Sequence, residues 1–301
     1  MSKNIQILMR LAFAFIVIVV GNYVIVAQTG FAGDWKAEIR SEKNLDKIQL
    51  SLERRNAEGK NQHSSSYSYN DLQGLSREKA LAGGTVKFSI VREAGTIECE
   101  GSFQGGKGAG TFRFTANRQF ISAMKTRGFD FEADASVGKK ADFEDKLFAA
   151  TTLNVTTALA DDLLSADFGK LDIDDLFKAA IFKVDSQFMR EMKASGFPNL
   201  GMEELVKARI FKVDADFARE VVAMGFNKEP FESLVKMRIF KVTPEFITEV
   251  RNEGLTNLDV EDLVKMRIFK IDSQFIREAK AAGVPLEVEK LVQKRIGVWG
   301  K

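Results

Sequence analysis

The sequence has few of the residues that most often carry enzyme chemistry: its 301 residues include one histidine, His63, and one cysteine, Cys99. A single histidine excludes zinc sites built from several imidazoles, and a single cysteine excludes thiolate clusters and an internal disulfide. His63 lies in a serine-rich polar segment that has no nucleophile-elbow pattern. We therefore predict no catalytic residue, no metal site and no cofactor.

The chain also lacks a clear excess of charge of either sign, with 44 lysines and arginines against 42 aspartates and glutamates. Loss of residues 1–27 would take away Lys3 and Arg10 and no acid, which leaves a formally neutral chain. A nucleic-acid-binding surface normally shows as a basic excess. We therefore expect no nucleic-acid partner.

The first 27 residues have the layout of a secretory signal peptide. Lys3 and Arg10 come first, residues 11–20 are uninterrupted apolar, and Ala27 offers a small residue for cleavage. We expect export to the periplasm or the extracellular space. In the alternative, residues 11–27 stay in place as a short membrane anchor, and only then do we expect contact with a membrane.

Residues 33–115 alternate between apolar and polar side chains, which predicts strands of a small antiparallel β-meander with one buried face. Cys99 falls on an inward position, so we expect a buried, inert thiol. Residues 93–96 and the glycine run at 105–110 are expected to be hairpin turns. The glycine run lacks the spacing of a phosphate-binding loop. Residues 61–70 are expected to form a polar loop that ends in an edge strand.

Residues 116–301 contain a repeat. The pattern Leu-Val-Lys-x-Arg-Ile-Phe-Lys begins at Leu205, Leu234 and Leu263, each 29 residues after the last, with a weaker copy at Leu176 and a truncated one at Leu291. A fixed period of this length indicates supersecondary units that must stack to bury their apolar faces. We predict an α+β protein in which the β domain precedes an αα-hairpin repeat array, a short α-solenoid, with an insertion near residues 130–146.

Each repeat reads as two short helices. The first helix follows an N-capping residue, and a glycine in the left-handed conformation is expected to close it. The expected capping residues are Asp185, Asp214, Thr243 and Asp272, and the expected closing glycines are Gly196, Gly225, Gly254 and Gly283. The second helix carries the Leu-Val-Lys-x-Arg-Ile pattern.

Residues 238–250, Arg-Ile-Phe-Lys-Val-Thr-Pro-Glu-Phe-Ile-Thr-Glu-Val, resemble tail repeats of some bacterial membrane metallopeptidases of the BlaR/MecR type and of uncharacterised exported proteins. The segments at residues 33–35 and 92–96 resemble the β domain that precedes those repeats. The peptidase part has no counterpart, since the chain contains no His-Glu-x-x-His motif. The resemblance therefore implies a fold and an exported location, and no catalytic residue.

Two groups of repeat positions are candidates for binding. Stacking would align a Phe-Lys ladder, formed by Phe182, Lys183, Phe211, Lys212, Phe240, Lys241, Phe269 and Lys270. In the alternative, these phenylalanines are core residues and the lysines neutralise the ends of the second helices. The other candidates share one phase of the first helix but differ in chemistry: Lys193, Val222, Arg251 and Lys280.

The remaining recurrent charges have simpler expected roles. Lys207 follows Glu203 by four residues, a spacing typical of weak pairs within one helix, and the next two repeats do the same. We expect Arg209 and its equivalents to pair with acids such as Glu220. The acid pairs at residues 161–162 and 174–175 lie at expected helix starts.

The sequence thus predicts an exported, non-catalytic protein-interaction module, a scaffold or adaptor whose partner is another envelope protein. The alternative is a binder of envelope glycans or anionic polymers that uses the Phe-Lys ladder. A second alternative is a hydrolase with an unrecognised acid pair. The sequence gives no prediction of oligomeric state.

Overall fold

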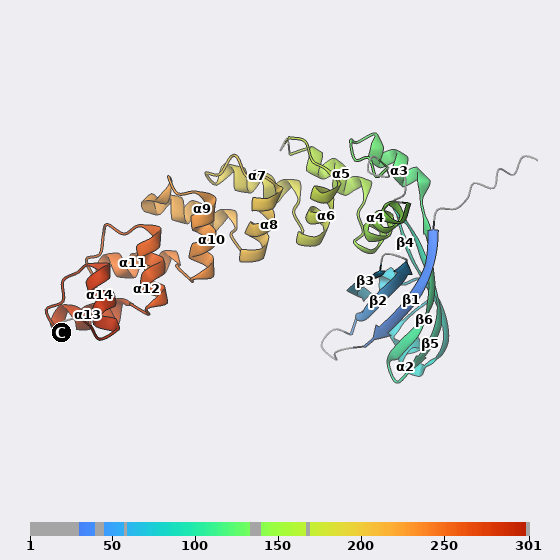
Figure 1. The fold of residues 1–301 in the computed structure, drawn as a ribbon, viewed down its shortest axis with the longest axis horizontal. Helices are drawn as coiled ribbons and strands as arrows, with labels where there is room; N and C mark the ends of the chain where they lie inside the picture. Colours follow the sequence, from blue (N-terminus) through green and yellow to red (C-terminus); the bar gives the residue numbers. More distant parts are fainter. Residues whose placement is uncertain (1–29, 40–44, 57–58, 133–139, 167–168, 299–301) are drawn as a thin grey trace, which may run out of the picture. The chain divides into compact units, whose positions relative to one another are not determined.

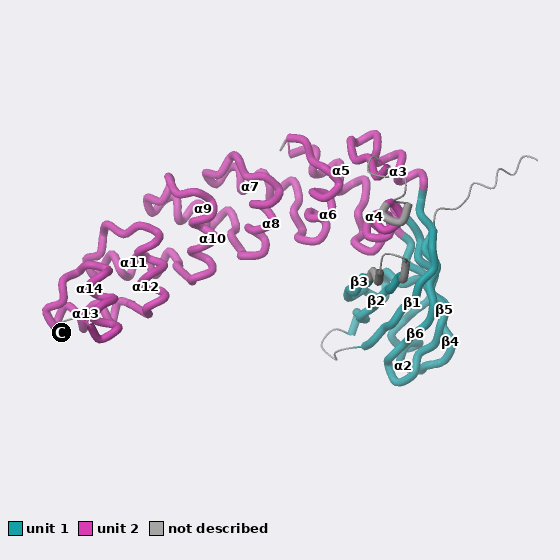
Figure 2. The backbone as a smooth tube through the Cα atoms, viewed as in Figure 1, with its two compact units in different colours: residues 1–91, 95–117 teal, residues 92–94, 118–301 magenta. Residues whose placement is uncertain are grey.

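The computed structural model describes residues 30–39, 45–56, 59–132, 140–166 and 169–298. The chain divides into two compact units (Figure 2). Unit 1 takes the residues up to Val91 together with Gly95–Asn117, and unit 2 takes Arg92–Ala94 and the chain from Arg118 onward. The first unit is a β-sheet and the second is helical, so the predicted α+β fold with a helical array is confirmed. The predicted signal peptide lies outside the described residues.

Unit 1 is a curled six-stranded antiparallel sheet (Figure 1). Its strands are β1 (Gly30–Glu38), β2 (Lys47–Asn56), β3 (Gly59–Ser68), β4 (Gly84–Arg92), β5 (Gly95–Gln104) and β6 (Lys107–Ala116). The order across the sheet is β3-β2-β1-β6-β5-β4. The sheet is therefore two three-stranded meanders, and the pairing of β1 with β6 joins them. A 3₁₀ turn, Tyr69–Asp71, and the short helix α2 (Arg77–Ala82) lie between β3 and β4.

The period-two pattern of the sequence places one face of this sheet in the core. Trp35 is 1% exposed, and its ring packs against Phe88 and Phe103 at centroid distances of 5.2 and 5.6 Å. The Trp35 indole Nε1 donates a hydrogen bond to the Glu100 carbonyl at 3.1 Å, so the buried polar atom is satisfied. Cys99 is buried, as expected, and burial raises the pKa of its thiol to about 12.

The turns follow the glycine chemistry of the sequence. Gly105 and Gly106 have φ of 57° and 75°, the conformation that a tight hairpin between β5 and β6 requires. The glycine run is thus a hairpin, as predicted. The expected polar loop at residues 61–70 is wrong for most of its length, because β3 runs from Gly59 to Ser68 and pairs fully with β2. Ser64, Ser65 and Ser66 are all exposed on this edge strand, so the apolar alternation that usually indicates a strand is missing.

Unit 2 begins with α3 (Arg118–Lys125) and α4 (Lys140–Thr152). The helices that follow alternate between two layers (Figure 1). One layer holds the first helix of each repeat: α5 (Thr157–Leu164), α7 (Ser186–Ala194), α9 (Ala215–Val221), α11 (Pro244–Asn252) and α13 (Ser273–Ala281). The other holds the second helices: α6 (Ile173–Phe182), α8 (Met202–Phe211), α10 (Phe231–Ile239), α12 (Val260–Ile268) and α14 (Val288–Arg295). A π-helical turn, Val222–Phe226, extends α9.

Contacts run between like helices of neighbouring repeats. Each second helix packs on the next, from α6 through α14, so the apolar stripe of every helix is buried by the repeat beside it. The expected caps are confirmed: the side chains of Asp185, Asp214, Thr243 and Asp272 each accept a hydrogen bond from an amide of the first turn. The closing glycines have φ between 75° and 103°.

The predicted insertion near residues 130–146 needs correction at its C-terminal end. Residues 133–139 are not described, but α4 already begins at Lys140. The amphipathic pattern of α4 is weak at its start because the segment is rich in charge. Phe131, just before the undescribed stretch, is 1% exposed and contacts Phe120 and Phe177 edge-on. The start of this segment therefore belongs to the core of unit 2.

Candidate interaction surface

The turn that leaves each second helix carries apolar side chains into solvent. An isoleucine lies at the end of each of these helices, and four of them are about half exposed: Ile181 51%, Ile210 51%, Ile239 48% and Ile268 53%. The next residue, a phenylalanine, is 37% exposed at both Phe211 and Phe240 and half-buried at Phe182 and Phe269. The alternative in which these phenylalanines are core residues is therefore wrong.

The lysine that follows has an unusual backbone. Lys183, Lys212, Lys241 and Lys270 have φ of 58°, 57°, 57° and 52°. Glycine or asparagine is the common residue in this left-handed conformation, which costs other residues about 1 kcal/mol or more. The lysine side chains are exposed. We name the twelve residues Ile181–Lys183, Ile210–Lys212, Ile239–Lys241 and Ile268–Lys270 the Ile-Phe-Lys stripe.

The stripe lysines differ from a second set of lysines on the same helices. Lys178 contacts Glu203 at 2.6 Å and Lys207 contacts Glu232 at 2.5 Å, and the same pairing joins Lys236 to Glu261 and Lys265 to Glu289. Each of these pairs links one repeat to the next. The expected pairs within one helix, such as Glu203 with Lys207, are therefore replaced by pairs between repeats. The stripe lysines form no ion pair with any described residue.

The recurrent arginines do not pair as expected either. Arg209 lies over the ring of Phe188 at 3.7 Å, and Arg238 lies over Phe217 at the same distance. Arg267 over Phe246 and Arg295 over Phe275 repeat this cation–π contact. Arg238 also lies 3.7 Å from the carboxylate of Asp214. The predicted pairing with a recurrent acid is thus found in one repeat, and the partner there is Asp214, not Glu220. A guanidinium stacks well on a flat ring while its edge stays hydrated, so one side chain both covers the core phenylalanine and remains near solvent.

Two of these arginines also reach the stripe. Arg267 Nε donates to the Phe240 carbonyl at 3.3 Å, and Arg295 donates to the Lys270 carbonyl. These carbonyls lie at the ends of second helices, where no intrahelical donor is left. Each arginine therefore ties its own repeat to the stripe turn of the repeat before it.

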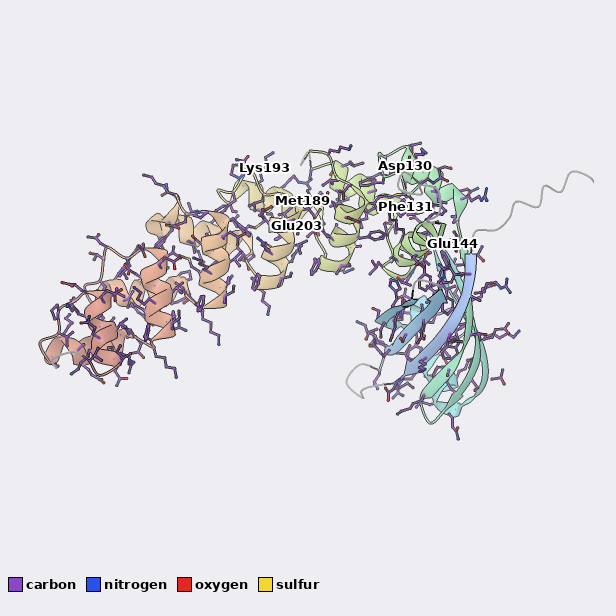
Figure 3. All side chains as sticks on the ribbon, viewed as in Figure 1. Asp130, Phe131, Glu144, Met189, Lys193 and Glu203 are labelled. Carbon is purple, nitrogen blue, oxygen red and sulfur yellow. The ribbon has the colours of Figure 1, made fainter. Side chains whose placement is uncertain are left out.

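The other predicted binding residues lie elsewhere. Lys193 is on α7 in the first-helix layer, whereas Glu203 is on α8 in the second (Figure 3). Arg251 donates to the Met224 carbonyl at 3.0 Å, and Lys280 donates to the Glu253 carbonyl at 3.1 Å. These residues occupy the C-terminal ends of first helices, at the opposite end of each helix from the stripe. Arg251 and Lys280 thus each bond to a carbonyl of the repeat before them, which gives them a structural role.

The acid pairs are engaged in the fold. Arg127 donates to both oxygens of Asp161, at 2.7 and 2.9 Å, and this hydrogen-bonded pair lowers the pKa of the Asp161 carboxyl. Asp162 accepts from the hydroxyl and the amide of Ser186, which lowers its pKa as well. Asp175 and Asp172 form a capping box at the start of α6. The contacts of Asp161 and Asp162 favour the charged form of these two carboxyls, and all of these contacts hold helix ends together.

A shallow depression lies on the solvent-facing side of the sheet in unit 1. Its volume is about 660 Å³, and its lining includes Lys87, Glu98, Glu100 and Arg113. Lys87 and Glu100 pair across it at 2.7 Å. In the described part of the chain, no cluster of His, Cys, Asp and Glu is arranged to hold a metal ion. None of the described helices combines the length and apolar character that crossing a bilayer requires.

Comparison of the chain with protein-family models, with curated proteins and with solved structures gives no match. The resemblance to repeats of the BlaR/MecR-type peptidases therefore stays a prediction. Sequence reasoning identified the Phe and Lys positions of the stripe but missed its isoleucines. Their recurrence at residues 181, 210, 239 and 268, directly after a buried helix face, was the signal available.

Proposed function

We propose that this chain is an exported, non-catalytic protein-interaction module, a scaffold or adaptor whose partner is another protein of the cell envelope. The observation that carries the proposal is the Ile-Phe-Lys stripe. A half-exposed isoleucine recurs four times at the same place in the repeat, and the phenylalanine after it is exposed in two repeats and half-buried in the other two. Contiguous exposed apolar surface with a polar rim is typical of protein-binding sites. Stacked repeats commonly bind proteins through such extended surfaces.

The test is capture of partners from native envelope extract by immobilised residues 28–301, with the retained material identified by mass spectrometry. A double variant, Ile210→Ser with Ile239→Ser, removes the apolar part of the two central turns. The control is Leu81→Ser with Leu164→Ser, two leucines outside the stripe that are 48% and 41% exposed. We expect one protein to be retained by the wild type and the control and lost with the stripe variant. Equal retention by all three would refute the proposal.

The alternative of an envelope glycan or anionic polymer has one observation in its favour, the four stripe lysines without an ion pair. Binding of a polyanion through lysines weakens steeply as ionic strength rises, because salt screens exposed charges over about 8 Å at physiological concentration. Protein binding through the isoleucines would persist at high salt. Repeating the capture at 0.05 and 0.5 M salt, about 14 and 4 Å of screening length, separates the two.

A further inference from the structure

We propose that the Ile-Phe-Lys stripe binds an extended polypeptide segment that carries a carboxylate at every third residue and apolar residues between. This inference rests on the proposed function and names the chemistry of the partner. It comes from three features of the stripe: the lysines without an ion pair to any described residue, the spacing expected between stacked repeats, and the acidic groups beside the apolar ones in three of the four turns.

Charge is the first observation. Within the second helices, one lysine of every repeat is neutralised by a glutamate of the next repeat, as Lys207 is by Glu232. The stripe lysine of the same repeat, Lys212, is exposed and has no such partner among the described residues. The fold thus satisfies one lysine ladder internally and leaves the other for an anion from outside. Lysine also occupies a backbone conformation better suited to glycine, in four repeats, which indicates that its side chain is needed there.

Spacing is the second observation. Helices that pack side by side have axes about 8–10 Å apart, so we expect successive stripe lysines to recur at roughly this interval. A polyproline II segment advances about 3.1 Å per residue with three residues per turn, so its every third side chain recurs at about 9.3 Å on one face. Side chains on one face of a β-strand recur every two residues, at about 6.6–6.8 Å. They would no longer align with the stripe lysines after two repeats. The polyproline II spacing matches the stripe.

The composition of each turn is the third observation and distinguishes a peptide from a lipid surface or a uniform polyanion. In three of the four turns the stripe lysine is followed two residues later by a capping carboxylate, as Asp214 follows Lys212; in the fourth turn the capping residue is Thr243. A uniformly anionic surface would meet both groups and be repelled by the acid. A single carboxylate of a peptide can contact Lys212 without approaching Asp214. The apolar side chains on either side of that carboxylate can cover Ile210 and Phe211.

The turns are also held in place before any ligand arrives. The bonds from Arg267 to the Phe240 carbonyl and from Arg295 to the Lys270 carbonyl fix consecutive turns to one another. Such preorganisation lowers the entropy lost on binding an extended chain.

The test measures fluorescence anisotropy of a labelled peptide of four Glu-Pro-Leu triplets with the full chain. A peptide of the same composition with its glutamates grouped at one end controls for spacing. Lys212→Gly with Lys241→Gly removes two charges at positions where glycine suits the backbone. Lys170→Gln with Lys228→Gln removes two exposed lysines elsewhere and is the control for net charge. Circular dichroism verifies that every variant is folded.

We expect the triplet peptide to bind and the grouped peptide to bind more weakly. The Lys212→Gly, Lys241→Gly variant is expected to lose about tenfold in affinity, since each exposed ion pair strengthens binding by a factor of about three. Equal binding of both peptides would overturn the proposal that the stripe requires a carboxylate at every third residue. Failure of both peptides, with stripe-dependent capture of a folded envelope protein intact, would overturn this inference and leave the proposed function standing. Stripe-dependent binding to vesicles containing phosphatidylglycerol, without peptide binding, would overturn it in favour of a lipid surface.

Discussion

At the scale of single residues, the stripe lysines combine a conformational cost with an exposed charge. A lysine in the left-handed region is less favourable than a glycine by about 1 kcal/mol, and the greater freedom of glycine in the unfolded chain offsets a similar amount. The side chain therefore adds little to folding by itself.

We expect Lys241→Gly to change the free energy of unfolding by less than about 1 kcal/mol, and Lys241→Val to lower it by about 1 kcal/mol or more, because a β-branched residue tolerates φ near 57° poorly. Urea titration followed by circular dichroism measures both. A large loss of stability in Lys241→Gly would show that the lysine side chain stabilises the fold, and would weaken the argument that it serves a ligand.

Cys99 differs from the exposed stripe lysines, because the fold buries its thiol. Burial raises the pKa of its thiol to about 12, so the thiolate, which is the nucleophile, is nearly absent at pH 8. We expect no reaction of the native chain with a disulfide reagent at pH 8 and one equivalent of reaction in denaturant. Rapid labelling of the native chain would contradict the buried position in β5.

At the scale of elements, the segment that leads into α11 holds one phenylalanine in the core and another partly in solvent, six residues apart. Phe246 is 5% exposed and lies under the Arg267 guanidinium, whereas Phe240 is 37% exposed. Removal of a buried aromatic ring leaves a cavity that close packing cannot fill.

Phe246→Ala is expected to destabilise the array by about 3–5 kcal/mol, and Phe240→Ala by less than about 1 kcal/mol. The helical signal at 222 nm during thermal or urea unfolding measures the difference. Equal effects of the two substitutions would show that the stacked core is not arranged as described.

The lysine–glutamate pairs between repeats are a second element-scale feature. Lys207 and Glu232 meet at 2.5 Å, but both side chains are about half exposed, so water and salt screen the attraction. We expect a double-mutant cycle of Lys207→Met and Glu232→Gln to give a coupling of about 0.2–1 kcal/mol that falls towards zero in 1 M salt. A larger, salt-insensitive coupling would mean that the pair is less hydrated than its exposure indicates.

At the scale of the whole molecule, the two units have separate cores. Trp35 lies in the core of unit 1, and the helical signal comes almost entirely from unit 2. In a Trp299→Phe background, tryptophan fluorescence would report the sheet alone. We expect Phe246→Ala to shift the unfolding midpoint measured by circular dichroism and to leave the midpoint measured by fluorescence unchanged. Coincident shifts of both signals would indicate that the units unfold as one.

Much of the architecture could be predicted from the sequence because its signals are local or periodic. Thr243 before Pro244 marks a helix start, and Gly254 marks its end, since each requirement is satisfied within one turn. The 29-residue period then implied stacking. The edge strand β3 was missed because its serines and glutamines carry no apolar alternation, and its place depends on pairing with β2. The start of α4 was missed for a similar reason.

The sequence by itself determined the α+β class, the repeat and its caps, and the inertness of the single cysteine, because backbone propensity, period and burial are encoded in each segment separately. Only the tertiary structure decided which charges meet. Lys207 pairs with Glu232 instead of Glu203, and Arg209 stacks on Phe188, since stacking brings residues of neighbouring repeats closer than those one turn apart. The same stacking leaves the side chains of Ile210, Phe211 and Lys212 exposed to solvent. These side chains and their equivalents form the surface to which we assign the proposed binding.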